Sequence, residues 1–130
     1  MIKADKIDLS KGQWEFNARP YSPTRSIQIN RLYHKWLGEI AKKTGYPIDE
    51  ITNYCKFTFG CPISIRDSEQ FAELYDELIS NLVYEQALRS MAFIAVTSDF
   101  NNKQMVEYMR GVESYAAQTD TILTKPEFDL

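Results

Sequence analysis

Residues 25–44 read RSIQINRLYHKWLGEIAKKT, and this stretch is the strongest amphipathic helix in the sequence. Its apolar residues recur at spacings of three and four, which places them on one face of an α-helix. They are Ile29, Leu32, Tyr33, Trp36, Leu37, Ile40 and Ala41. The opposite face is basic and polar, with Glu39 as its single acid. The stretch therefore predicts a helix that offers a hydrophobic ridge to a core and a basic stripe to an outside partner.

Helical periodicity continues in three segments further along the chain. Asp67 and Gln70 form a predicted capping box for the third helix, and Asn101 with Gln104 gives the same signal before the last one. The third helix has a possible break at Ser80–Asn81. We expect about four α-helices, at 25–44, 47–59, 67–89 and 102–118.

Two regions favour strands. Residues 1–20 hold two alternating runs around a central Lys-Gly, which predicts a β-hairpin. The run at 92–97 is rich in residues that favour strands, and 61–65 is expected to be an extended link or short strand. Residues 119–130 lack periodicity and are expected to be a loose tail. We therefore predict one α+β domain over 1–130, in which a small antiparallel sheet (the hairpin plus a strand near 92–97) packs with about four helices.

The charge of the chain is unevenly distributed. The net charge is −3, but residues 1–66 carry 11 Lys and Arg against 6 acids, and residues 67–130 carry 4 against 12. One part of the surface is thus suited to phosphates and another repels them, unless the two halves interleave in space. Cys55 and Cys61 are too few for a disulfide framework and indicate reduced thiols. With no signal peptide or membrane span in view, we expect a cytoplasmic protein.

Catalytic motifs are missing from the sequence. It has no phosphate-cradling glycine loop, and its single histidine, His34, lies on the basic helical face with no nucleophile in sight. We therefore expect no catalytic residues, no metal site and no cofactor. A Mg²⁺-dependent nuclease remains a minor alternative, because the helix at 67–89 carries the carboxylates Glu69, Glu73, Asp76 and Glu77. A solvated helix face is the favoured explanation of these acids.

The basic stripe is the leading candidate for a binding site. Proteins that bind single-stranded nucleic acid combine cations along the backbone with aromatic platforms for the bases. Tyr21 and His34 suit stacking, whereas Tyr33 and Trp36 lie on the apolar face and favour core packing. The candidate phosphate contacts are Arg19, Arg25, Arg31, Lys35, Lys42 and Lys43.

Two motifs resemble the NinB (Orf) family of phage recombination proteins. Residues 25–37, RSIQINRLYHKWL, resemble the family motif R-S-x-x-Q-N-x-x-Y/L-W-x-W/L, and residues 97–109, TSDFNNKQMVEYM, resemble T-x-x-L-S-T-K-E-F-x-E-Y-M. The resemblance extends over roughly residues 19–120. Ile29-Asn30 stands in place of the family's Gln-Asn pair, with Gln28 one position earlier, and His34 takes the place of an aromatic residue.

The resemblance implies a non-catalytic, homodimeric recombination mediator in the cytoplasm of a bacterial host. Such a protein binds single-stranded DNA and cooperates with single-strand-binding protein or a host recombination protein. It also implies polar or stacking contacts to DNA from Gln28, Asn30 and His34. The alternative is a phage-encoded protein-interaction module or DNA mimic, which docks a host protein through the acidic half of the chain.

Overall fold

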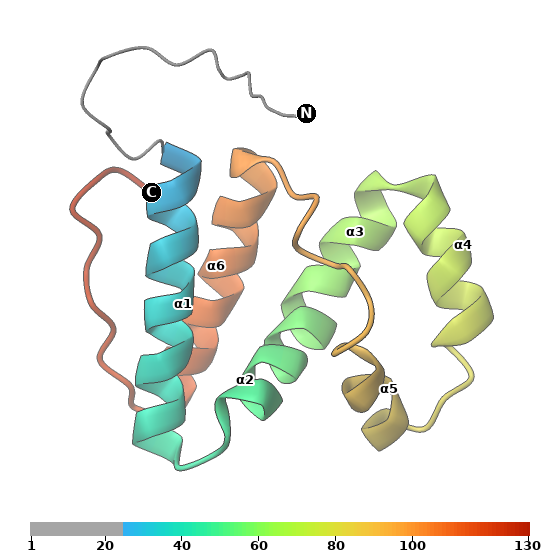
Figure 1. Ribbon diagram of the computed structural model, residues 1–130, viewed down its shortest axis with the longest axis horizontal. Coiled ribbons are helices and arrows are strands. Elements are labelled where there is room, and N and C mark those ends of the chain that lie inside the picture. Colours follow the sequence, from blue (N-terminus) through green and yellow to red (C-terminus); the bar gives the residue numbers. More distant parts are fainter. Residues whose placement is uncertain (1–24) are drawn as a thin grey trace, which may run out of the picture.

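The computed structural model describes residues 25–130, and all regular structure in this range is helical (Figure 1). The elements are α1 (Arg25–Thr44), α2 (Ile48–Cys55), the π-helical turn η1 (Lys56–Gly60), α3 (Cys61–Asp67), α4 (Glu69–Leu78), α5 (Tyr84–Ser90) and α6 (Asn102–Gln118). The described part is therefore all-α, and the predicted α+β class with a small antiparallel sheet is wrong for it. The hairpin expected at residues 1–20 lies outside the described residues.

Helices α1 and α6 lie side by side and run in the same direction (Figure 1). Ser26 Oγ donates to Asn102 Oδ1 at 3.0 Å near their N-terminal ends, and the hydroxyls of Tyr33 and Tyr108 meet at 2.8 Å two turns further on. The nearly constant sequence offset of 76 and 75 residues shows the parallel arrangement. The bounds of both helices agree with those predicted, because long apolar stripes mark each of them.

The segment α2–η1–α3 is one nearly continuous helical rod, so the predicted extended link at 61–65 is wrong. Pro62 occupies the first turn of α3, where its missing N–H costs little. Its ring would clash with the carbonyl four residues earlier in a regular helix, and the wider turn of η1 relieves this clash. Gly60 has a helical backbone, and α6 and the 96–97 region pack so closely there that a larger residue would not fit: a β-carbon would lie 2.8 Å from Cγ1 of Val96.

Helices α4 and α5 replace the single helix predicted for 67–89, with the chain non-helical from 79 to 83. The cap of α4 is Ser68, whose Oγ accepts from the N–H of Phe71 at 3.1 Å, so the predicted Asp67–Gln70 capping box is wrong by one residue. The carboxylate of Asp67 is instead bound by Arg66. The capping box predicted for Asn101 and Gln104 is present at the start of α6.

The strand predicted near 92–97 is a series of turns. After α5 the backbone closes four-residue turns, such as Ala92 N–H to Arg89 O at 3.2 Å and Phe93 N–H to Ser90 O at 3.0 Å. A strand needs a neighbour for its backbone hydrogen bonds, and the described residues provide none. Val96 is buried among Cys61, Ile79, Ala87 and Met91, whereas Phe93 is 90% exposed.

The C-terminal tail, residues 119–130, has no helix but runs back along α1 toward its N-terminal end (Figure 1). Leu123, Phe128 and Leu130 pack against the main core. Trp36 Nε1 donates to the carbonyl oxygen of Thr124 at 2.7 Å. The segment expected to be loose is therefore docked on the core. Its sequence has no helical or strand periodicity from which these contacts could have been predicted.

Candidate nucleic-acid interface

The outer face of α1 carries three exposed cations in line. Arg31, Lys35 and Lys42 are spaced by four and seven residues, which places them on one side of the helix. At about 1.5 Å per residue, this basic row extends over about 16 Å, several times the rise per nucleotide of about 3.4 Å in one strand of a duplex. The ion pairs among the described residues join other cations, Arg66 and Arg110. The basic row is therefore available to an anionic partner.

The single acid of α1 is engaged by the tail. Glu39 Oε1 accepts from the N–H of Thr124 at 2.9 Å, and Glu39 Oε2 accepts from the hydroxyl of the same residue. Together with the Trp36 bond to the Thr124 carbonyl, these contacts direct the carboxylate toward the tail. No carboxylate on α1 then pairs with the basic row, although Glu39 still contributes its negative charge nearby.

A cleft of about 540 Å³ opens beside the N-terminal half of α1. Asn30 and His34 line it from α1, together with side chains from η1, the segment before α6, and α6 itself. The ring of His34 lies 5.2 Å from that of Tyr33 at a tilt of 48°. An amide, an imidazole and several hydroxyls thus converge on one hollow, which suits hydrogen bonding to the edge of a base and contact with its ring face. The lining residues include Ser26, Asn30, His34, Lys56, Thr97, Ser98, Phe100 and Asn102.

The other predicted contact residues are spread more widely. Lys43 is exposed and, with Lys42, borders a hollow of about 490 Å³. Asp120 lines the same hollow, so an acid lies near the C-terminal end of the basic row. Gln28 is half-buried. Arg25 is the first residue of α1, and Arg19 lies outside the described residues.

The apolar face of α1 belongs to the core. Tyr33 and Trp36 are 4% and 1% exposed, which confirms the core packing predicted for them. Burial raises the pKa of Tyr33 to about 12, so its hydroxyl stays neutral and shares a hydrogen bond with Tyr108. Ile29 is 1% exposed. At the position where the NinB motif has glutamine, this chain therefore has an apolar core side chain, which also borders the cleft beside α1.

Several cleft residues were not among the predicted contacts. Lys56 is half-buried, its ammonium donates to the carbonyl of Met91, and burial lowers its pKa. Thr97, Ser98 and Asn102 reach the cleft from the segment before α6 and from the first turn of α6. They belong to the second NinB-like motif, 97–109, which is the one sequence signal that points to this segment.

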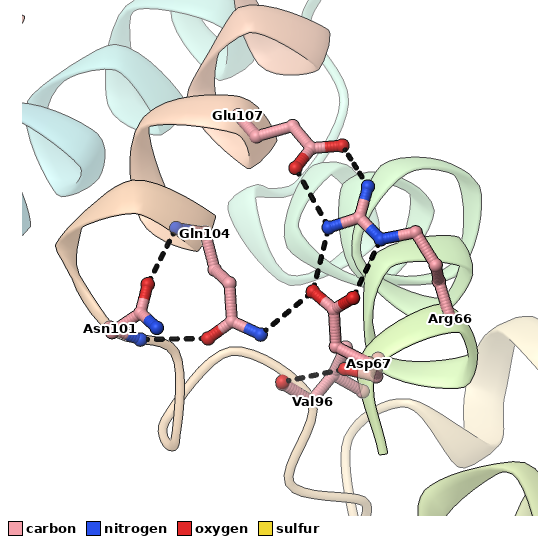
Figure 2. A network of polar contacts seen from close by, with 7 residues as sticks. Arg66, Asp67, Val96, Asn101, Gln104 and Glu107 are labelled. Atoms are coloured by element: carbon pink, nitrogen blue, oxygen red, sulfur yellow. Dashed lines mark hydrogen bonds and ion pairs between the residues drawn. The ribbon is translucent and has the colours of Figure 1, made fainter. Parts of the chain in front are cut away.

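A polar network fixes α6 and the chain before it against α3 (Figure 2). Arg66 binds both oxygens of Glu107, at 2.7 and 3.0 Å, and both oxygens of Asp67, at 2.7 and 2.6 Å. Gln104 Nε2 donates to Asp67 Oδ2 at 3.1 Å, and Gln104 Oε1 accepts a hydrogen bond from the backbone N–H of Asn101 at 2.9 Å. The Arg66 guanidinium holds the pKa of Asp67 at about 2 and lowers that of Glu107. The network thus positions one wall of the cleft.

The acidic residues proposed for a nuclease lie on the solvent side of α4. Glu69, Glu73, Asp76 and Glu77 are all exposed. Within residues 25–130, no three His, Cys, Asp or Glu side chains are placed to hold a metal ion. Cys55 and Cys61 are buried free thiols, and burial raises the pKa of each, to about 12 and about 11. Over the same range, no helix is both long and apolar enough to cross a membrane.

Comparisons with protein-family models, with curated proteins and with solved structures find no match for this chain.

Proposed function

We propose that this chain is a non-catalytic protein that binds single-stranded DNA along the outer face of α1. The observation that carries the proposal is the basic row: three exposed cations without ion-pair partners among the described residues, on a helix whose only acid is held by Thr124. Such a row suits the repeated charge of a phosphate backbone.

The adjoining cleft gives the bases a place to lie. With phosphates at Arg31 and Lys35, a base turned toward the protein meets Asn30 and His34 at the rim of the 540 Å³ cleft. The bases of a single strand are free to enter such a hollow, whereas those of a duplex are stacked and paired. The arrangement therefore favours single-stranded over double-stranded DNA.

The biological role as a recombination mediator rests on the resemblance to the NinB family alone. It includes cooperation with single-strand-binding protein or a host recombination protein, a homodimeric state and the cytoplasm of a bacterial host. Light scattering tests the dimer, since a monomeric mass at micromolar concentration contradicts it. Co-elution with single-strand-binding protein tests the partnership.

The charges of the basic row provide the direct test of DNA binding. Arg31→Ala combined with Lys35→Ala should weaken binding to single-stranded oligonucleotides of every sequence alike, because the lost contacts are to phosphates. Arg89→Ala combined with Arg110→Ala removes the same charge from exposed positions outside the basic row and serves as the control. Equal affinity of wild type and the first double variant in a filter-binding assay would remove the basic row as the site.

One observation favours a protein-interaction module as the second candidate. Helix α4 has no buried residue, and its Leu78 is 57% exposed beside the acids of that helix. An apolar face with an acidic border suits a basic host protein. A partner retained from host lysate after nuclease treatment, and lost from Leu78→Lys, would support this function. Loss of every partner on nuclease treatment would indicate bridging by DNA.

A further inference from the structure

A third hollow, of about 430 Å³, lies between α2, α5 and α6 and shares no lining residue with the basic row or its cleft. Its volume falls in the range of about 300–1,000 Å³ that is usual for small-molecule sites. The walls combine aromatic, aliphatic and charged side chains, namely Tyr46, Glu50, Ile51, Asn53, Tyr54, Glu85, Leu88, Arg89 and Tyr115.

Three tyrosine rings form the aromatic part of this tyrosine cavity. The rings of Tyr54 and Tyr115 lie 4.7 Å apart at an angle of 40°, and both side chains are half-buried. Burial raises the pKa of Tyr115, so its phenol remains neutral. Tyr46 is 57% exposed and lies at the mouth, in the segment between α1 and α2. Neutral aromatic rings present a negative face to a cation placed against them.

The charges at the cavity select the sign of a ligand. Glu50 and Glu85 belong to the first turns of α2 and α5, and both are exposed. Arg89 is the only cation in the lining, which leaves the cavity with a net charge of −1. Among residues 25–130 the observed ion pairs involve none of these three side chains. The excess of carboxylates over Arg89, together with the aromatic faces, favours a cation over a phosphate here.

We propose that the tyrosine cavity binds an alkylated ammonium group, such as the trimethylammonium group of choline. The methyl groups contact the apolar walls formed by Ile51 and Leu88, the positive charge lies against the tyrosine rings, and Glu50 and Glu85 supply the counter-charge. This inference does not depend on DNA binding, because it involves a different surface and the opposite charge.

The test compares choline with 3,3-dimethyl-1-butanol, which has nearly the same shape but no charge. Each is titrated into the full isotopically labelled chain while backbone amide NMR shifts are followed. We expect choline to shift amides of α2 and α5 and to bind about tenfold more tightly than the neutral compound, which is within the range of cation–π interactions. Equal affinity for the two compounds, or no shift with choline, would overturn the proposal.

Variants at exposed positions locate the site without disturbing the core. Glu85→Gln and Tyr46→Leu should each weaken choline binding several-fold, whereas Glu73→Gln, which removes the same charge from α4, should leave it unchanged. A similar loss in Glu73→Gln and Glu85→Gln would show a general charge effect and contradict a defined site. Tighter binding of Nε-trimethyl-lysine than of choline would support the proposal with a modified lysine as the source of the group, and weaker binding would support it with a free small molecule.

Discussion

Replacing Gly111 by alanine is expected to destabilise the protein by about 1–2 kcal/mol. A β-carbon at Gly111 would lie 2.5 Å from Cγ and Cδ1 of Phe59 and 2.8 Å from its Cβ. Turning the ring cannot remove the last contact, since Cβ is attached to the backbone of η1. Overpacking of this kind costs about 1–3 kcal/mol, and the gain of up to about 1 kcal/mol from alanine in a helix offsets only part of it.

The matched control is the same substitution on α1. A β-carbon at Gly38 has no atom within 4 Å, so Gly38→Ala should stabilise the protein by about 0.5–1 kcal/mol. Urea unfolding followed by far-UV circular dichroism measures both changes. A Gly111→Ala variant as stable as wild type would refute the close packing of α6 on η1, and with it the position of α6 beside the cleft.

Three further predictions concern single polar side chains. Ser68→Ala should lower the free energy of unfolding by about 1 kcal/mol through loss of the α4 cap, whereas Gln70→Ala should be nearly neutral in the same urea titration. A larger loss in Gln70→Ala than in Ser68→Ala would instead support the capping box of Asp67 and Gln70. Because the folded-state pKa of Asp67 is about 2, below its ordinary value near 4, its stabilising effect is complete above pH 4 and declines toward pH 2. The urea midpoint of Asp67→Asn should therefore lie below that of wild type at pH 7 and approach it at pH 2, and a constant difference would contradict the assigned pairing with Arg66. Glu39→Gln should tighten binding of single-stranded oligonucleotides several-fold by removing the single acid of α1, the helix that carries the basic row. Weaker binding would show that the docked tail itself is needed.

The sequence was most informative where one element meets the core along its whole length. The apolar stripes of α1 and α6 extend over several turns, so periodicity locates both helices and the buried Tyr33 and Trp36. The same periodicity turns Arg31, Lys35 and Lys42 outward. These predictions depend on the local chain alone, which explains their agreement with the structure.

The predictions that failed depend on contacts between distant segments. The run 92–97 favours a strand only if another strand is available, and here Val96 packs against Cys61 and Gly60 instead. Gly60 and Pro62 look like helix breakers, but close packing requires the first and the π-helical turn accommodates the second. Asp67 is a residue type that often caps helices, but here its carboxylate accepts hydrogen bonds from Arg66 and Gln104 and does not cap α4.

In the candidate site, too, local sequence predicted some residues, whereas contacts between distant segments determine the others. Asn30 and His34 could be named from their place on α1, but the cleft they line exists only because the 96–101 segment and η1 meet α1. Lys56 looked like one more helical residue, and its contact with the carbonyl of Met91 joins positions 35 residues apart. Likewise, the hydrogen bonds between Glu39 and Thr124 join residues 85 positions apart, which no local pattern indicates.

Fluorescence anisotropy with labelled single-stranded and double-stranded oligonucleotides at two salt concentrations tests the central claim most directly. Neutralisation of one phosphate by each cation of the basic row predicts a slope of about −2 or steeper in log K against log salt, at about −0.7 per phosphate on single strands. It also predicts tighter binding to the single strand than to the duplex. No change in anisotropy with the single strand at low salt, or a slope near zero, would contradict a phosphate-binding surface on α1.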